Sequence, residues 1–172
     1  KKRIETYAHA LEQKSKLLST HAERDPLTEL YNKRGTMMAL TRELNAAQRR
    51  KSPVSLIYMD VDKFKFINDT FGHAKGDEVL HALGEAMVKS CRSTDFACRV
   101  GGDEFCVILP DAEPGMARDI AGKIREAFRA LFPEFSFSAG VASTGPDTFV
   151  TEDELLDAAD KAMYAAKQKG QA

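Results

Sequence analysis

The amino-acid sequence predicts an α+β fold in which helices flank a mainly antiparallel central sheet, with one further helix at the N-terminus. Short apolar segments rich in strand-forming residues alternate with longer segments of helical periodicity. Two of the strand-like segments are joined through Gly101-Gly102, a pair that favours a β-hairpin. The chain has 172 residues, 43% of them hydrophobic, which suffices for one compact core with an appendage.

The first segment, residues 1 to about 22, is predicted to form an exposed helix. Ile4, Leu11 and Leu18 recur every seven residues, which makes a partial heptad seam. Polar residues at the intervening seam positions weaken it, so two interpretations stay open: a solvated helix, or a signalling helix that dimerises. The segment Asp25-Pro26-Leu27-Thr28 ends this helix, because proline lacks an amide donor and restricts the residue before it.

The remaining elements are predicted to follow in the order α, β, α, α, β, β, α, β, α. Asn32 is a suitable N-cap for the first of these helices. Thr151 and Glu154 are spaced as a capping box at the start of the last one. The predicted helices cover about residues 33–50, 64–71, 77–89, 116–131 and 151–170, and the predicted strands cover residues 54–61, 96–100, 105–109 and 135–142.

Composition limits the partners and the compartment of the protein. The net charge of −1 and the pI near 6.5 favour neither nucleic acid nor an anionic membrane, so we expect no nucleic-acid partner. Cys91, Cys98 and Cys106 are odd in number and form no CxxC pair, which favours free thiols in a reducing compartment. Cys98 and Cys106 can face each other across the hairpin. The chain opens with Lys1 and has no spanning stretch, so we expect a cytoplasmic fragment of a longer protein, whose membrane anchoring is left open.

Two acidic segments predict the chemistry. Asp103 follows the glycine pair of the hairpin turn, and Asp60 ends a strand-like apolar run. An acid at the carboxyl end of a buried strand commonly faces a ligand site in open sheets. Magnesium prefers hard oxygen ligands and usually takes only one or two protein carboxylates. We therefore expect Asp60 and Asp103 to converge on a divalent cation whose coordination is completed by the phosphates of a nucleoside triphosphate.

Six motifs between Asp25 and about Gly170 resemble the GGDEF domain, the catalytic domain of diguanylate cyclases. The resemblance implies a palm-like, ferredoxin-type fold similar to that of nucleotidyl cyclases. It also implies condensation of two GTP molecules to cyclic di-GMP and two pyrophosphates across a homodimer. The motifs are Asp25-Pro26-Leu27-Thr28 with Leu30 and Asn32, Asp60 through Asp69, Phe71-Gly72-His73 with Gly76-Asp77, Gly101 through Phe105, Ser138-Ala139-Gly140, and Ala159-Asp160 through Tyr164 to Lys167.

The resemblance assigns a metal site with two magnesium or manganese ions per active half-site. Asp60, Asp103 and the backbone carbonyl of Val61 correspond to the metal ligands of the family. Asp103 and Glu104 correspond to its catalytic acids, although the residues alone do not give Glu104 a separate role. Two such ions would stabilise both the attacking and the leaving oxygen of an in-line displacement.

The resemblance also assigns the substrate contacts. Guanine needs an acceptor for its N1 and N2 donors and a donor for its O6 or N7. The family positions that read this edge correspond to Asn68 and Asp77. The family positions that make further contacts with the base or the phosphates correspond to His73, Phe64, Lys65 and Lys167.

Arg92 and Asp95 precede the glycine pair and resemble the inhibitory RxxD site, which binds a stacked dimer of the product. Arg118 or Arg125 on a neighbouring helix is a candidate second arginine of that site. Without the resemblance, Arg92 and Asp95 would be read as a surface ion pair. The implied partners are thus GTP, cyclic di-GMP as product and inhibitor, a second copy of the chain, and an upstream sensor domain.

These assignments divide the chain into a linker helix over residues 1–24 and a cyclase domain over residues 25–172. Two other functions stay open: a catalytically weak receptor for cyclic di-GMP or GTP, and a dimerisation module. A zinc site at His73, Asp77 and His81 is a further alternative, since these residues recur every four positions. Gly76 weakens a helix there, so we expect His81 to lie on a helix surface or in the core instead.

Two residues depart from the family pattern. Glu29 stands where glycine is usual, and a turn that needs positive φ would be strained there. Gln171 occupies a position where an arginine is common after the glycine at position 170. We expect the missing arginine to weaken GTP binding by about 1–2 kcal/mol unless Lys169 or Lys161 replaces it.

Overall fold

The computed structural model describes residues 2–170, and its elements follow the predicted order. Residue Gln171 therefore lies outside the described residues. The helices are α1 (Lys2–Glu23), α2 (Lys33–Arg50), α3 (Phe64–Phe71), α4 (His73–Ser90), α5 (Pro114–Leu131) and α6 (Glu152–Gly170), and the strands are β1 (Val54–Val61), β2 (Phe96–Arg99), β3 (Glu104–Pro110) and β4 (Phe137–Thr144).

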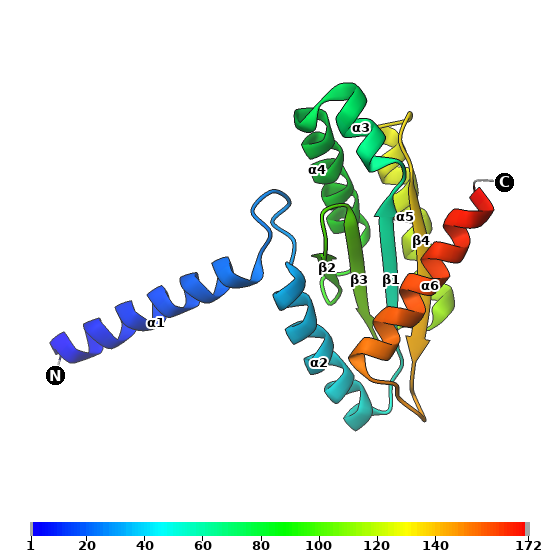
Figure 1. The fold of residues 1–172 in the computed structure, drawn as a ribbon. Coiled ribbons are helices and arrows are strands. Elements are labelled where there is room, and N and C mark those ends of the chain that lie inside the picture. The colour runs from blue at the N-terminus through cyan, green and yellow to red at the C-terminus, as the bar shows by residue number, and fades with distance from the viewer. Residues whose placement is uncertain (1, 171–172) are drawn as a thin grey trace.

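Within residues 2–170, the strands form one antiparallel sheet in the order β2-β3-β1-β4 (Figure 1). Strand β3 lies between β1 and β2, so the chain has the split βαβ arrangement of ferredoxin-like folds. The predicted α+β class, the antiparallel sheet and the N-terminal helix are confirmed. This order places the end of β1 beside the turn that joins β2 to β3.

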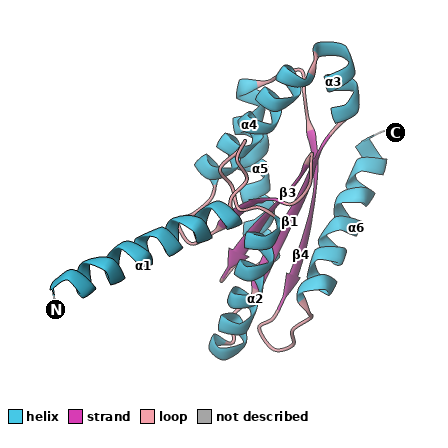
Figure 2. Ribbon diagram, turned by 60° about the vertical axis from the view of Figure 1, so that its left-hand side comes forward, coloured by secondary structure: helices cyan, strands magenta, loops and turns pink. Residues whose placement is uncertain are grey.

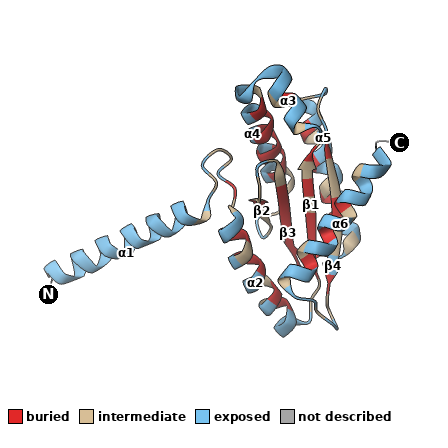
Figure 3. Ribbon diagram, in the orientation of Figure 1, coloured by how far each residue is buried: buried red, intermediate tan, exposed pale blue. Residues whose placement is uncertain are grey.

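The sheet is covered by helices on both faces (Figure 2). Because side chains alternate along a strand, Ile57 and Met59 of β1 pack with α4 and α5, whereas Leu56 of the same strand packs with α2 and α6. The buried residues lie along the strands and the inner faces of these helices (Figure 3). Cys98 and Cys106 face each other in the β2–β3 register as buried free thiols.

Helix α1 extends away from the sheet and its covering helices and is exposed over its described side chains (Figures 1 and 3). Ile4, Leu11 and Leu18 expose 74%, 67% and 63% of their surface. Three large apolar side chains at heptad spacing are thus left without a packing partner in the monomer. No helix within residues 2–170 is both long enough and apolar enough to cross a membrane.

Several predicted boundaries need correction. Helix α4 begins at His73 rather than at 77, because Gly72 adopts a φ of 89° that joins α3 directly to α4. Helix α5 begins at Pro114, since proline suits the first position of a helix. Strand β4 lies two residues later than predicted, because Phe135 is held in a turn by a hydrogen bond to the carbonyl of Phe132.

The predicted helix caps are confirmed. The Asn32 side chain accepts a hydrogen bond from the amide of Gly35 at 2.9 Å. The Thr151 hydroxyl accepts from the amide of Glu154, and the Glu154 carboxylate accepts from the amide of Thr151, both at 3.2 Å.

Candidate active site

Two acidic segments meet at the end of β1. Asp60 and Glu104 are register partners on neighbouring strands, and the Val61 amide donates to the carbonyl oxygen of Asp103 at 3.1 Å. The Asp60 and Asp103 carboxyl groups are near enough to interact electrostatically. Burial, together with this neighbouring carboxylate, raises the pKa of Asp103 to about 6. The two carboxyl groups that the sequence predicted to converge therefore do so.

Lys167 balances part of this negative charge. Its Nζ donates to Oδ2 of Asp60 at 2.8 Å, across a sequence separation of 107 residues. This hydrogen bond raises the pKa of Lys167. The other carboxylate oxygen, Oδ1 of Asp60, is buried and has no hydrogen-bond partner within the described part of the chain. A buried acceptor without a donor is costly, so this oxygen is suited to a cation.

A close approach of backbones brings Lys167 to the site. Gly140 of β4 lies directly under α6, and a β-carbon there would come within 2.5 Å of the Ala162 carbonyl carbon and 2.6 Å of the Ala159 carbonyl oxygen. Only glycine lets α6 pack this closely on the sheet. The helix then carries the lysine to the end of β1.

The donor set suits magnesium or manganese. Asp60, Asp103 and the backbone of Val61 offer hard oxygen atoms, and Asp60 retains one that is buried without a donor. Among the residues that the structure describes, no group of three or more His, Cys, Asp or Glu side chains is arranged to hold a metal. A site built from two carboxylates would thus depend on substrate oxygens to complete its coordination.

The structure does not support the alternative zinc site at His73, Asp77 and His81. The reason is not that Gly76 interrupts the helix, as the sequence predicted. Helix α4 continues through Gly76, so that residue does not interrupt the helix. His73, Asp77 and His81 do lie on this helix, but they span two full turns, and His81 pairs with Glu85 at 3.6 Å. His81 is a helix-surface residue, as expected.

Glu104 points to the face of the sheet covered by α2 and α6. Burial raises its pKa, as do Asp60 and Asp160, while Lys33 and Lys167 oppose the rise. A cavity of about 200 Å³ lies on this side, between Glu104, Tyr58 and Asp160. Glu104 therefore lies beside Asp60, on the face of the sheet that α2 and α6 cover.

Apart from Lys167 on α6, the predicted substrate-binding residues lie on α3 and α4. Phe64 and Lys65 occupy the first turn of α3, which has no side-chain cap. Its amides are therefore open to an acceptor. Asn68 is half-buried near the end of α3, whereas His73 and Asp77 are exposed on the first turns of α4.

Asp62 has a structural role that the sequence did not predict. Its carboxylate accepts hydrogen bonds from the hydroxyls of Ser136 and Ser138, each at 2.6 Å, and its amide donates to the Ser136 carbonyl. These bonds fasten the turn before α3 to the start of β4. Ser136 and Ser138 are two residues apart, so a strand would place their side chains on the same face. Their shared partner Asp62 lies 74 residues from Ser136 and cannot be inferred from the neighbouring sequence.

Arg99 and Asp25 form a second link that the sequence did not predict. Arg99 Nη1 donates to both Asp25 oxygens at 3.1 and 3.0 Å, while its Nε and Nη2 donate to the Gly102 carbonyl at 3.1 and 2.7 Å. Burial alone would raise the pKa of Asp25, but bonds from Thr28 and Arg99 outweigh it and lower the pKa. The guanidinium thus joins the segment after α1 to the glycine turn.

The same segment contains Glu29, which adopts a φ of 60°. The turn that usually carries glycine therefore keeps its left-handed conformation here. A non-glycine residue in that region costs about 1 kcal/mol or more. A glycine at position 29 would avoid this cost.

We expect Arg99→Lys to lower both the stability and the ordering of the glycine turn. Lysine cannot bond Asp25 and Gly102 together, because it lacks the planar fork of arginine. The expected loss is about 1.5–3 kcal/mol of unfolding free energy, the scale of a hydrogen bond to a charged group. Urea denaturation measures it. Asp25→Asn in the Arg99→Lys background should add little, and full additivity of the two changes would contradict the link.

Arg92 and Asp95 lie between α4 and β2, away from the glycine turn. Arg92 donates to Asp95 through Nε and Nη2, and Nη2 also donates to the Pro110 carbonyl at 2.8 Å. The hydrogen bond to Asp95 raises the pKa of Arg92. Arg125 donates to the Phe137 carbonyl at 2.8 Å, which commits this candidate second arginine to β4.

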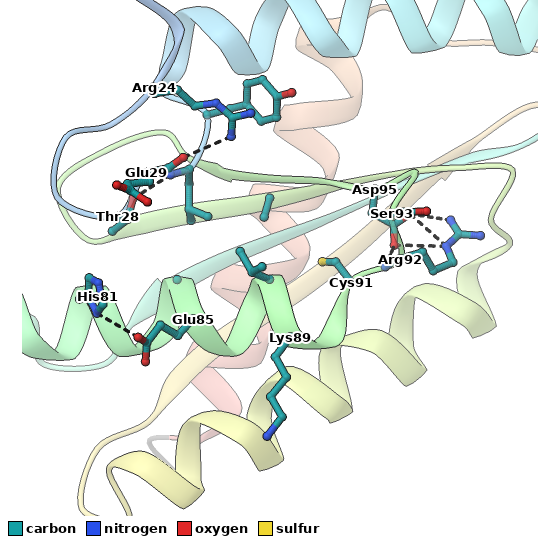
Figure 4. Close-up of a pocket in the computed structure, with 15 residues that line it drawn as sticks. Arg24, Thr28, Glu29, His81, Glu85, Lys89, Cys91, Arg92, Ser93 and Asp95 are labelled. Carbon is teal, nitrogen blue, oxygen red and sulfur yellow. Dashed lines mark hydrogen bonds and ion pairs between the residues drawn. The ribbon is translucent and has the colours of Figure 1, made fainter. Parts of the chain in front are cut away.

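A cavity of about 740 Å³ adjoins Arg92 and Asp95 (Figure 4). It runs between α4, which contributes His81 and Lys89, and the segment after α1, which contributes Arg24 and Glu29. The predicted inhibitory pair is therefore at one end of a groove that reaches the segment joining α1 to α2.

The chain belongs to the family described as "Diguanylate cyclase, GGDEF domain", whose model matches residues 22–172. It is similar to the probable diguanylate cyclase DgcT of Escherichia coli K12, with 36% identity over 157 residues, covering 87% of this chain and 34% of that protein. Diguanylate cyclase DosC of the same organism is 35% identical over 152 residues, covering 85% of this chain and 33% of that protein. The chain thus spans about a third of the length of these relatives.

Solved structures agree. The coiled coil and GGDEF domain of DgcB from Caulobacter crescentus, in complex with c-di-GMP, has a TM-score of 0.86 at 25% identity and covers 96% of this chain and 91% of that chain. Diguanylate cyclase SiaD from Pseudomonas aeruginosa, in complex with its activator SiaC, has a TM-score of 0.84 at 31% identity and covers 98% of this chain and 67% of that chain.

Proposed function

We propose that the chain is a diguanylate cyclase that condenses two GTP molecules to cyclic di-GMP and two pyrophosphates. The observation that carries this proposal is the convergence of Asp60 and Asp103 at the end of β1, beside the open first turn of α3. Two close carboxylates repel each other unless a cation or a proton lies between them. Family membership supports the same chemistry.

In each of the two transfers of the proposed reaction, the 3′-oxygen of one nucleotide forms a bond to the α-phosphorus of the other. The bond between the α- and β-phosphates breaks, and pyrophosphate leaves with the bonding electrons. Asp60, Asp103 and the Val61 carbonyl would hold two magnesium or manganese ions, which supply charge neutralisation and acidify the attacking hydroxyl. Asp103, with a pKa of about 6, is ionised at neutral pH and can accept the hydroxyl proton.

The other residues would position the substrate. Lys167, now paired with Asp60, is near enough to the site to be shared with a phosphate. Phe64 and Lys65 would offer amides and a cation to the same phosphates. Asn68 and Asp77 would read the guanine edge, with His73 as a further contact.

Incubation of the chain with GTP and magnesium tests the proposal. Nucleotide analysis should show one cyclic di-GMP for every two pyrophosphates, and chelation of magnesium should stop the reaction. A concentrated sample that binds GTP but makes no cyclic di-GMP would refute the enzyme and favour the receptor alternative.

The reaction as proposed requires a homodimer, because each chain holds one GTP. The exposed heptad positions of α1 support dimerisation through this helix. We expect removal of residues 1–22 to lower specific activity in dilute protein and to have little effect in concentrated protein. A dilution series from nanomolar to micromolar protein measures this. Equal activity at every dilution in both proteins would contradict dimerisation through α1.

We further propose that product binds at Arg92 and Asp95 and inhibits the enzyme. Asp95 is fully buried and holds a partly exposed guanidinium in one orientation, which suits a guanine edge or a phosphate. Arg92→Ala should weaken cyclic di-GMP binding roughly tenfold or more, the scale of one charged hydrogen bond. Calorimetry with the product measures this, and Arg49→Ala on the exposed surface of α2 is a matched control. Unchanged affinity in Arg92→Ala would remove the inhibitory site.

A further inference from the structure

The junction between α3 and α4 contains a side chain with an unmet hydrogen bond. Oδ1 of Asn68 is buried and has no donor within the described residues. Asn68 is on the last turn of α3, and its backbone carbonyl accepts from the amide of Gly72, where the two helices join. A buried amide oxygen without a donor is uncommon and calls for an explanation.

Oδ1 of Asn68 lies against Gly76. Gly76 is buried on the first turns of α4, and a β-carbon at this position would overlap Oδ1 of Asn68 and lie 3.0 Å from its Cγ. The same β-carbon would be 3.3 Å from Cζ of Phe64. The Asn68 amide therefore occupies space that exists only because position 76 has no side chain.

Helix propensity does not explain a glycine here. Gly76 lies within α4 and has ordinary helical backbone geometry, since positive φ is found at Gly72 and Gly145 among the glycines of the described residues. Alanine would favour the helix at such a position. The contact with Asn68 is what the glycine uniquely permits.

We propose that Gly76 is a specificity-determining positioning residue for the base of the nucleotide. By leaving room for the Asn68 amide, it holds an acceptor beside the turn that carries Asp77, where a guanine N–H can satisfy it. This inference rests on the proposed function, because it takes a guanine nucleotide as the ligand. It adds a residue that acts through Asn68 without touching the base.

The Gly76→Ala variant tests the inference through base selectivity. A displaced Asn68 loses its hydrogen bond to the base, so the ratio of GTP to ITP affinity should fall roughly tenfold, since ITP lacks the 2-amino group. Calorimetry with non-reacting α,β-methylene analogues of both nucleotides measures this without requiring turnover. Gly122→Ala on α5, where no atom lies within 4 Å of the added carbon, should leave the ratio unchanged.

A double-mutant cycle separates positioning from a general structural defect. In an Asn68→Ala background, Gly76→Ala should change the selectivity ratio no further, because the group it displaces is absent. Unchanged selectivity in the single variant, or additive effects in the cycle, would overturn the inference. A Gly76→Ala chain that fails to fold would also overturn it, because the expected displacement is local.

The proposed function can fail separately. A wild-type chain that binds GTP but makes no cyclic di-GMP refutes the cyclase and still tests Gly76 through binding. A wild-type chain with equal affinity for GTP and ITP overturns the inference even if it is an active cyclase.

Discussion

Asp103→Asn is expected to reduce cyclic di-GMP synthesis by about 10³-fold or more, the scale of losing a charged group that acts on the transition state. The variant keeps the shape of the side chain but loses a negative charge next to Asp60. It therefore cannot help hold divalent ions or accept the hydroxyl proton. Turnover with GTP and magnesium measures the loss, and Asp119→Asn on the exposed surface of α5 should keep wild-type activity.

The same variant should be more stable than the wild type at neutral pH when divalent ions are chelated. The pKa of Asp103 is raised from 3.8 to about 6, so the folded state binds this proton more tightly than the unfolded state does. The stabilisation from this proton is complete below pH 3.8 and is lost as the pH rises through about 6. Asparagine does not titrate, so the advantage of the variant should grow between pH 4 and pH 7.

Thermal denaturation at several pH values in the presence of a chelator measures this difference. Added magnesium with a GTP analogue should stabilise the wild type and have less effect on the variant. A variant that keeps a tenth of wild-type activity, or a stability difference that does not change with pH, would contradict the arrangement of the two carboxyl groups.

Gly140→Ala is expected to lower both the stability and the activity of the protein. The added carbon would press on the backbone of α6 at Ala159 and Ala162, so the helix must move away from β4. Overpacking of this kind costs about 1–3 kcal/mol. For a chain of this size the midpoint of thermal unfolding should fall by about 3–10 °C.

Activity should fall as well, because the displaced helix carries Lys167 away from Asp60. The expected signature is a raised KM for GTP together with the lowered unfolding temperature. Gly122→Ala is the matched control, because its β-carbon points into open space. A Gly140→Ala chain with wild-type unfolding temperature would show that α6 does not depend on this close contact.

The sequence predicted the features that arise locally. Short apolar segments rich in strand-forming residues indicated the strands, Asn32 indicated the start of α2, and the glycine pair indicated the hairpin. The hairpin and the strand that ends in Asp60 then sufficed to predict that Asp60 and Asp103 lie together. The apolar segments, the helix cap and the glycine pair are each recognised from residues within a few positions of one another.

The features that the sequence did not predict depend on partners far apart in the chain. Asp62 meets Ser136 and Ser138, and Arg99 meets Asp25, each across 74 residues or more. Periodicity carries no information about such pairs. Helix α4 begins four residues earlier than the sequence predicts, because it includes Gly76 despite the low intrinsic helix propensity of glycine.

Binding of manganese with a non-reacting GTP analogue tests the central claim most directly, namely that Asp60 and Asp103 together bind divalent cations with the nucleotide. Calorimetry across pH 5 to pH 8 should show affinity that rises through about pH 6, because the metal competes with the proton on Asp103. Asp103→Asn should weaken binding roughly tenfold or more and remove this pH dependence. Equal affinity in the two proteins, with the same pH profile, would contradict the claim.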